Sequence, residues 1–165
     1  METFDKIFYF LTFLSILGSG LMAGVFFAFS IAVMKALGRL PPAEGMSAMQ
    51  SIDIVIVNPI FLFVFLGTGI ACVVLSIASV FKWQTNGSGY LLLGALAYII
   101  GSILITSFIN VPMNNALAAA SPTDPSSADL WSNYLSNWTM WNHIRTIGSL
   151  AAAALLMVAM LSRPE

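Results

Sequence analysis

The sequence predicts an all-α integral membrane protein, a four-helix transmembrane bundle formed by one domain over residues 1–165. Charged residues make up 8% of the chain and hydrophobic residues 59%, and the mean hydropathy is +0.92, whereas about 25% of the residues of a soluble domain are charged. Four segments also reach the roughly 20 apolar residues that a helix needs to cross a bilayer. A soluble globular protein is therefore excluded.

The first two predicted spans cover residues 7–34 and 58–81. The first contains no charged side chain and is too long for the apolar core of a signal peptide, and its N-terminal flank carries acidic residues. The second begins with Asn58 and Pro59, residue types that suit the N-cap and the first turn of a helix. We therefore expect two retained transmembrane helices, the second with a well-defined start.

The third and fourth predicted spans cover residues 90–111 and 144–161. The third follows a turn at residues 86–89 and ends where Pro112 removes a backbone donor and disfavours helix at the preceding residue. The fourth can start as early as Trp138. Because four spans cross the membrane an even number of times, both termini are expected on one face.

The two long connections lie on the other face and predict interfacial helices of their own. Residues 42–57 suit a surface helix, a re-entrant segment or an early extension of the second span. In the third connection, Asp124 and Pro125 can begin an amphipathic helix. Its aromatic face can form a Trp and Tyr belt at the interface or line the entrance of a site. The apolar residues of this helix are Leu130, Trp131, Tyr134, Leu135 and Trp138.

The charge pattern bears on the binding partners and on the orientation in the membrane. The net charge is −1 without a basic run, which excludes nucleic acid and leaves membrane lipid as the expected partner. Residues 114–144 contain no Lys or Arg, which favours cytoplasmic termini.

Gly20 and Gly24 form a small-xxx-small pair that packs helices within the bundle or joins two copies of the chain. Both alternatives, including the homo-oligomer, remain open.

Polar residues gather at one end of the predicted spans. Such groups are costly inside a membrane and usually face a partner or a wet cavity, so their positions are the strongest functional signal in the sequence. We expect them to form one polar vestibule that binds substrate. The spans supply Asn58, Thr106, Asn110, Asn114, Asn142, His143, Arg145, Thr146 and Ser149, and the first connection supplies Lys35 and Gln50.

His143 and Arg145 carry the candidate chemistry of this vestibule. A lone imidazole can act as a general base near neutral pH, although it can also be an interfacial group bonded to a backbone carbonyl. A guanidinium inside the boundary needs an anionic or carbonyl partner unless it snorkels to the head groups. When the residues of the fourth helix are placed at about 100° per residue, its polar side chains, including Asn142, fall in one sector. His143 lies at one edge of this sector and Arg145 at the other, so the two could flank a flat substrate.

Three asparagines have a structural alternative to substrate binding, and residues that bind metal ions are scarce. For Asn58, Asn110 and Asn114, capping of helix ends is the alternative to substrate contact. The chain has one histidine and one cysteine, and its acidic residues are confined to connections and termini. We therefore expect no metal site.

Five stretches of sequence occur in order along the chain: GVFFAFS at 24–30, MKAL at 34–37, AMQSID at 48–53 with NPIF at 58–61, NVPMNN at 110–115 and WTMWNHIRT at 138–146. Together they resemble the anthrone oxygenase-like family of small four-helix membrane proteins. Its fungal members are implicated in oxidising polyketide anthrones to anthraquinones with dioxygen, without a recognised metal or flavin. Its bacterial members suggest the bacterial cytoplasmic membrane as the location.

The resemblance implies a cofactor-independent oxygenase, a monooxygenase acting on an anthrone-like or quinol-like aromatic with dioxygen. An anthrone is a weak carbon acid whose enolate can react directly with dioxygen, so the protein need supply a base, an oxyanion partner and a flat apolar pocket. The alternative is a non-enzymatic membrane subunit or a lipid- or small-molecule-binding protein with a structural polar cluster. Under the oxygenase hypothesis the base is His143, the oxyanion partners are Arg145 and Asn142, the stacking walls are Trp138 and Trp141, and Asn110 and Asn114 orient the substrate.

Overall fold

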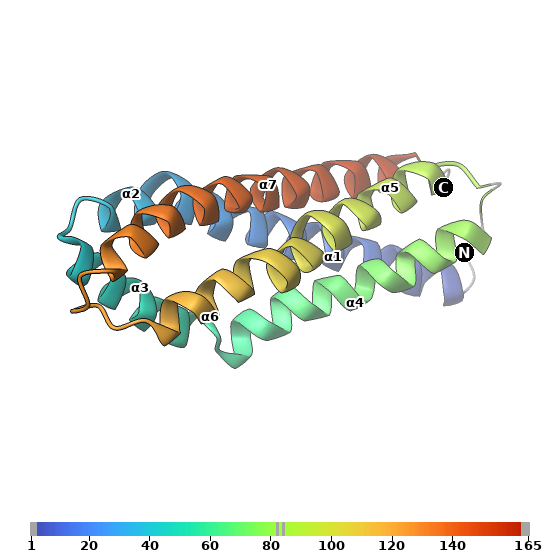
Figure 1. Cartoon of the computed structure of the whole chain (residues 1–165). Coiled ribbons are helices and arrows are strands. Elements are labelled where there is room, and N and C mark those ends of the chain that lie inside the picture. Colours follow the sequence, from blue (N-terminus) through green and yellow to red (C-terminus); the bar gives the residue numbers. More distant parts are fainter. Residues whose placement is uncertain (1–2, 82, 84, 163–165) are drawn as a thin grey trace.

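The computed structural model describes residues 3–81, 83 and 85–162, and every regular element in this part of the chain is helical. Four long helical segments lie side by side, with both chain ends at one end of the bundle and α2, α3 and α6 towards the other (Figure 1). The segments that begin with α1, α4 and α5 follow one another around the bundle, and α7 closes it against α1. The predicted all-α four-helix fold is confirmed.

The first segment is one long rod in three parts: α1 (Thr3–Ala28), the π-helical turn η1 (Phe29–Val33) and α2 (Met34–Leu37). After it, α3 (Pro42–Ile56) begins with a proline in its first turn, where the missing N–H costs least. Val57 then breaks the chain direction with a ψ of 68°. Residues 42–57 therefore contain a separate helix that packs on α2, α6 and α7 and is not an extension of the second span.

Asn58 caps the second span as predicted. Its side-chain Oδ1 accepts hydrogen bonds from the backbone N–H groups of Ile60 at 3.1 Å and Phe61 at 3.0 Å, and α4 runs over Pro59–Phe81. These bonds satisfy two of the donors that a helix N-terminus leaves free. The predicted turn before α5 contains Gly87 at a φ of +85°, a conformation that favours glycine.

The third segment continues further than the sequence predicted. It comprises α5 (Ser88–Tyr98), the π-helical stretches η2 (Ile99–Leu104) and η3 (Thr106–Asn110), and α6 (Val111–Ala119). The prediction that Pro112 ends the helix is wrong. Because η3 changes the hydrogen-bond register just upstream, Pro112 falls in the first turn of a new α-helical register, where a proline is tolerated.

The fourth segment is a single helix, α7 (Ser127–Leu161), that merges the predicted amphipathic helix with the fourth span. The two are continuous because the aromatic residues and the later polar ones lie on one buried stripe. At 1.5 Å per residue, α7 is about 52 Å long and so extends well beyond a hydrocarbon core of about 30 Å. The buried stripe recurs every three to four residues: Trp131, Tyr134, Trp138, Asn142, Arg145, Ser149, Ala152, Leu156 and Ala159.

Two glycines allow a close helix crossing. A Cβ atom added to Gly148 of α7 would lie 2.7 Å from the Cα of Gly101 in η2, so the two backbones touch. Gly20 and Gly24 are instead exposed on α1, where an added Cβ would meet nothing within 4 Å. The interpretation that this pair packs helices inside one chain is therefore wrong, and its role between two copies stays a prediction.

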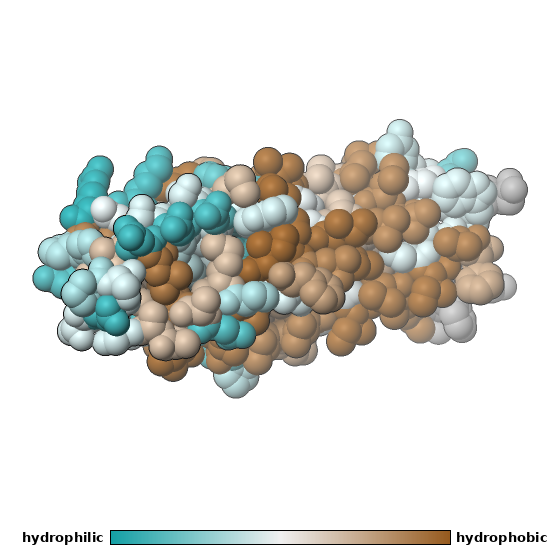
Figure 2. Space-filling model, in the orientation of Figure 1, coloured by the Kyte–Doolittle hydropathy of each residue, from teal (hydrophilic) through white to brown (hydrophobic). Residues whose placement is uncertain are grey.

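The surface has the character of a membrane protein. The four helical segments are long and apolar enough to span a bilayer over 6–37, 59–81, 88–119 and 127–161. Figure 2 shows hydrophobic side chains along the bundle and hydrophilic ones gathered at the end that carries α2 and α3. On α4, large apolar side chains such as Phe63 and Ile70 are exposed, as expected where lipid replaces water.

Candidate functional site

Arg145 lies at the centre of a buried polar cluster near the α3 end of the bundle. The side chain is 6% exposed. Its Nη1 donates a 3.0 Å hydrogen bond to Oγ1 of Thr106, and its Nη2 donates to Oδ1 of Asn142. Both partners are neutral, and Nε has no hydrogen-bond partner within the part of the chain that the structure describes. One nitrogen of a buried cation thus has no partner, which is costly unless a further group can approach it.

Aromatic rings enclose the same guanidinium. Its central carbon lies 4.2 Å from the ring centroid of Phe26 and 5.1 Å from that of Trp138. Both distances are within the range of cation–π attraction, which strengthens when the cation is desolvated. We call Arg145, Phe26, Thr106, Trp138 and Asn142 the arginine site.

Asn142 is held in a defined orientation. Its Nδ2 donates to the backbone carbonyl of Phe26 at 2.6 Å and to Oγ of Ser30 at 2.7 Å, so both amide donors point towards α1 and η1. Its Oδ1 must then face Arg145. Asn142 therefore orients the guanidinium, as a fixed acceptor on the same helix.

Two π-helical turns supply partners to this site. Ser30 belongs to η1, and Thr106 and Asn110 belong to η3. A π-helical turn inserts an extra residue into the helix and redirects the side chains around it, and such turns are frequent at functional sites. Asn110 is 1% exposed, donates weakly to the carbonyl of Trp138 at 3.5 Å, and keeps Oδ1 without a described partner.

Asn114 connects the arginine site to an acidic residue. Its Oδ1 accepts hydrogen bonds from the Tyr134 hydroxyl and from Nε1 of Trp138, each at 2.8 Å. Its Nδ2 donates to Oδ1 of Asp53 in α3 at 3.1 Å. We call Asn114, Asp53, Tyr134 and Trp138 the Asn114 network. It shares Trp138 with the arginine site.

Asp53 was missed at the sequence level, because acidic residues were assigned to the connections. It belongs to such a connection, but α3 folds back against the bundle and brings the carboxylate to the site. A usable signal exists in the sequence: Met46, Met49 and Asp53 share one face of a helix, and both methionines are completely buried.

The environment changes the acidity of Asp53. Burial raises the pKa of this carboxyl from 3.8 to about 6, although the positive charge of Arg145 acts in the opposite direction. Arg145 and Tyr134, both on α7, are the titratable groups that face it. Asp53 therefore changes its charge close to neutral pH, a property that is common at functional sites.

The aromatic face of α7 is buried in this region. Trp131 stacks on Tyr134 at 5.8 Å, Tyr134 on Trp138 at 6.0 Å, and Phe29 contacts Trp138 at 6.0 Å. The interpretation of these rings as an exposed interfacial belt is wrong, because α3 and α6 cover them. Tyr134 and Trp138 instead supply both an apolar wall and two hydrogen-bond donors.

The structure separates His143 from Arg145. His143 is exposed and shares its face of α7 with the exposed side chains of Met140 and Ile147, whereas Arg145 is buried. Two residues along a helix correspond to a rotation of about 200°, so the two side chains leave α7 on different sides. They do not flank one site in this arrangement. The role of His143 as a base stays a prediction.

Three other predicted site residues do not belong to the arginine site. Gln50 donates to the carbonyl groups of Leu117 at 2.8 Å and Ala120 at 3.0 Å, and so fastens α3 to the end of α6. Asn58 is the N-cap of α4, which agrees with the capping alternative. Lys35 is exposed on α2.

The last two predicted site residues, Thr146 and Trp141, lie on α7. Thr146 is buried and its Oγ1 donates to the backbone carbonyl of Asn142 at 3.0 Å, which is a bond within the helix. Trp141 is half-buried, and none of the ring contacts seen among the described residues involves it. Of the predicted site residues, the structure therefore brings together Thr106, Asn110, Asn114, Trp138, Asn142 and Arg145.

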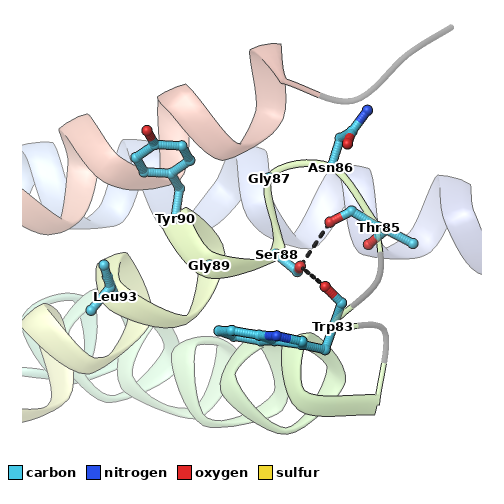
Figure 3. A pocket seen from close by; sticks show the side chains of 8 residues that line it. All are labelled: Trp83, Thr85, Asn86, Gly87, Ser88, Gly89, Tyr90 and Leu93. Carbon is cyan, nitrogen blue, oxygen red and sulfur yellow. Dashed lines mark hydrogen bonds between the residues drawn. The ribbon is translucent and has the colours of Figure 1, made fainter.

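A separate hollow lies at the other end of the bundle, in the turn between α4 and α5 (Figure 3). Its volume is about 520 Å³. Oγ of Ser88 donates to the carbonyl groups of Trp83 and Thr85 at 2.8 Å and 2.7 Å, so these polar groups are used within the turn itself. The hollow contains none of the predicted site residues, and within the described chain no group of His, Cys, Asp and Glu side chains is placed to hold a metal.

The fold and the site define a small four-helix membrane protein with a buried, aromatic-walled arginine. The sequence model of the family described as anthrone oxygenase matches residues 61–155, more than half of the chain, and the chain therefore belongs to the anthrone oxygenase family. No curated protein and no solved structure matches it. The matched range contains Thr106, Asn114 and Arg145, whereas Phe26 and Asp53 precede it.

Proposed function

We propose that the chain is a cofactor-independent monooxygenase that oxidises an anthrone-like or quinol-like aromatic with dioxygen. The observation that carries the proposal is Arg145, a buried cation between the rings of Phe26 and Trp138 with neutral partners and an unused Nε donor. A flat aromatic ring carrying a developing oxyanion would match both its walls and its charge. Family membership supports the same chemistry.

The overall reaction converts an anthrone and one dioxygen into an anthraquinone and one water. A base removes a proton from the methylene carbon, and the C–H electron pair moves to the carbonyl oxygen to form an enolate. The enolate carbon is oxidised by dioxygen and forms a C–O bond, and the resulting peroxide takes up a proton. Removal of the second methylene proton then breaks the O–O bond, which leaves a new carbonyl and releases hydroxide that becomes water.

The protein's contribution to this reaction is electrostatic. The enolate oxygen gains negative charge as the proton leaves, and a preorganised guanidinium in a water-poor site stabilises that charge more than water does. Asn142 fixes the guanidinium, and the aromatic walls would position the substrate. Asn110, with a free Oδ1, would contribute to orientation. Metal and flavin are not needed in this scheme, since the enolate itself reduces dioxygen.

The proposal also covers the location, the orientation and the oligomeric state of the protein. Membrane lipid would deliver an apolar substrate, and a bacterial cytoplasmic membrane is the proposed location. The absence of Lys and Arg from residues 114–144 supports cytoplasmic termini. The exposed pair Gly20 and Gly24 supports a homo-oligomer.

A non-enzymatic role is the second candidate, because most polar groups of the site are satisfied internally. An assay separates the two. Full-length protein in detergent is mixed with anthrone in air, and quinone absorbance is followed for the wild type, Arg145→Lys and a control without protein. Arg39→Lys, at an exposed arginine, is the matched variant.

We expect protein-dependent turnover that Arg39→Lys retains. Arg145→Lys keeps the charge but loses the forked donors, and should reduce turnover by about 100-fold to 1,000-fold. Equal rates with and without protein would favour the non-enzymatic role. Thermal unfolding of each variant shows whether a loss of turnover reflects loss of fold.

A further inference from the structure

We infer that Asp53 is the group that accepts the proton from the acidic carbon of the substrate. This inference rests on the proposed function and names a base for it. Asp53 reaches the site from α3, outside the four candidate spans, and is held there by Asn114.

One oxygen of the carboxylate is tethered and the other is available. Oδ1 of Asp53 accepts the 3.1 Å hydrogen bond from Nδ2 of Asn114. Oδ2 has no hydrogen-bond partner among the residues that the structure describes, and the side chain is half-buried. A carboxylate fixed through one oxygen, with a free lone pair on the other, has the form that a general base requires.

Asn114 can hold only one orientation. Its Oδ1 accepts from the Tyr134 hydroxyl and from the Trp138 indole N–H, so the amide nitrogen must point the other way, towards Asp53. Tyr134 and Trp138 are in turn stacked with each other and buried. The position of Asp53 is therefore fixed by a rigid aromatic pair.

Trp138 contacts Arg145 and shares a hydrogen-bond partner, Asn114, with Asp53. Its ring centroid is 5.1 Å from the guanidinium carbon of Arg145, and its Nε1 bonds to the same asparagine that holds Asp53. In an anthrone, the carbonyl oxygen and the acidic carbon lie at opposite ends of the central ring. A flat substrate that entered between the two charged groups would place its carbonyl oxygen towards Arg145 and its acidic carbon towards Asp53.

The acidity of Asp53 suits this task. Burial raises its pKa to about 6 while Arg145 opposes the rise, and Arg145 and Tyr134 are the titratable groups that face it. The carboxylate is then ionised at neutral pH, yet more basic than an ordinary aspartate, which is the range in which general bases are effective. The exposed His143 lies on another face of α7.

The proposed step is a proton transfer without oxidation. The free oxygen of the Asp53 carboxylate takes a proton from the methylene carbon of the substrate. The C–H electron pair becomes the enolate, whose negative oxygen lies next to Arg145. Asp53 becomes a neutral carboxylic acid and returns the proton later to the peroxide or to solvent.

This step can be measured without dioxygen. Full-length protein in detergent is incubated anaerobically with anthrone in heavy water, and incorporation of deuterium at the methylene carbon is followed by mass spectrometry. The samples are the wild type, Asp53→Asn, Asp53→Glu, His143→Ala and a control without protein. Glu44→Gln, at an exposed acid on the same helix, is the matched variant.

We expect the wild type to accelerate exchange and Asp53→Asn to lose about 100-fold or more of that acceleration. Asp53→Glu should restore part of it, and Glu44→Gln should match the wild type. The wild-type rate should rise with pH through an apparent pKa near 6, and this limb should be absent in Asp53→Asn. The asparagine variant can still accept the bond from Asn114, which favours an intact fold.

The outcomes separate the two proposals. Full exchange by Asp53→Asn together with loss in His143→Ala would overturn the inference and make His143 the base. Exchange that the wild type accelerates and Asp53→Asn loses, without quinone formation in air, would support Asp53 and overturn the oxygenase function. Quinone formation in air without accelerated exchange would overturn Asp53 and leave the oxygenase function standing.

Discussion

The side chains of Asn114 and Asp53 are joined by a 3.1 Å hydrogen bond although 61 positions separate them in the sequence. This bond ties α3, which lies outside the candidate spans, to α6 at the end of the third span. Because Asn114 also accepts two bonds from α7, it connects three elements through one amide. The site is therefore built where the bundle meets its surface helix.

Replacement of Asn114 by Leu should destabilise the protein strongly. The change leaves Tyr134, Trp138 and Asp53 each without a hydrogen-bond partner, and a buried polar group left unsatisfied costs about 1–3 kcal/mol. We expect a lower free energy of unfolding in detergent by several kcal/mol. Asn115→Leu, at the exposed neighbouring asparagine, is the control, and equal effects of both substitutions would contradict the network.

The charge of Asp53 predicts a particular pH dependence of stability. Since folding raises its pKa from 3.8 to about 6, its stabilising contribution is complete below 3.8 and is lost as the pH rises through 6. Asp53→Asn imitates the protonated form. We expect it to be more stable than the wild type at neutral pH, with the difference disappearing in acid, as measured by unfolding across this range.

Asp124 provides a comparison of opposite sign. Hydrogen bonds from the backbone N–H and the hydroxyl of Ser126 lower the pKa of its carboxyl. Its contribution to stability is therefore present above the ordinary pKa of 3.8 and lost as the pH falls. The same pH trend in Asp124→Asn and Asp53→Asn would show that the environment assigned to Asp53 is incorrect.

A methyl group at Gly148 should loosen the bundle. Its Cβ would lie 2.7 Å from the Cα of Gly101, where both neighbouring atoms belong to backbone, so the helices must move apart. Overpacking of this kind costs about 1–3 kcal/mol. Gly148→Ala should unfold at a lower temperature in detergent, whereas Gly20→Ala, which meets open space, should not. A destabilisation by Gly20→Ala alone would contradict the packing described.

Larger residues at Gly20 and Gly24 test the homo-oligomer. The pair is exposed on α1, so Gly24→Leu should leave the fold of one chain intact while preventing a second chain from approaching. Cross-linking in lipid vesicles should detect a dimer for the wild type and lose it in the variant. Gly67→Leu, at another position open to the surroundings, is the control. A monomeric wild type would exclude this interface.

The sequence was sufficient for the parts of the fold that depend on local signals. Hydropathy predicts four spans, and Asn58 marks the start of α4. Helix periodicity also placed Asn142 and Arg145 in one sector of α7, which the structure bears out as a buried stripe. These features depend on residues close together in the chain.

The rest depends on packing that no local pattern expresses. Pro112 does not end its helix because a π-helical register change precedes it. The aromatic residues after Ser127 continue into the fourth span because polar and apolar residues share one buried stripe. Asp53 reaches the site only because α3 folds back onto α6 and α7.

The most direct test of the proposed oxygenase activity is oxidation of anthrone with isotopically labelled dioxygen by the full-length protein in detergent. We predict quinone that carries one labelled oxygen atom, formed faster than in the control without protein and much more slowly by Arg145→Lys in samples that thermal unfolding shows to be folded at the assay temperature. Equal rates of quinone formation with the wild type, with Arg145→Lys and without protein would contradict the proposed activity.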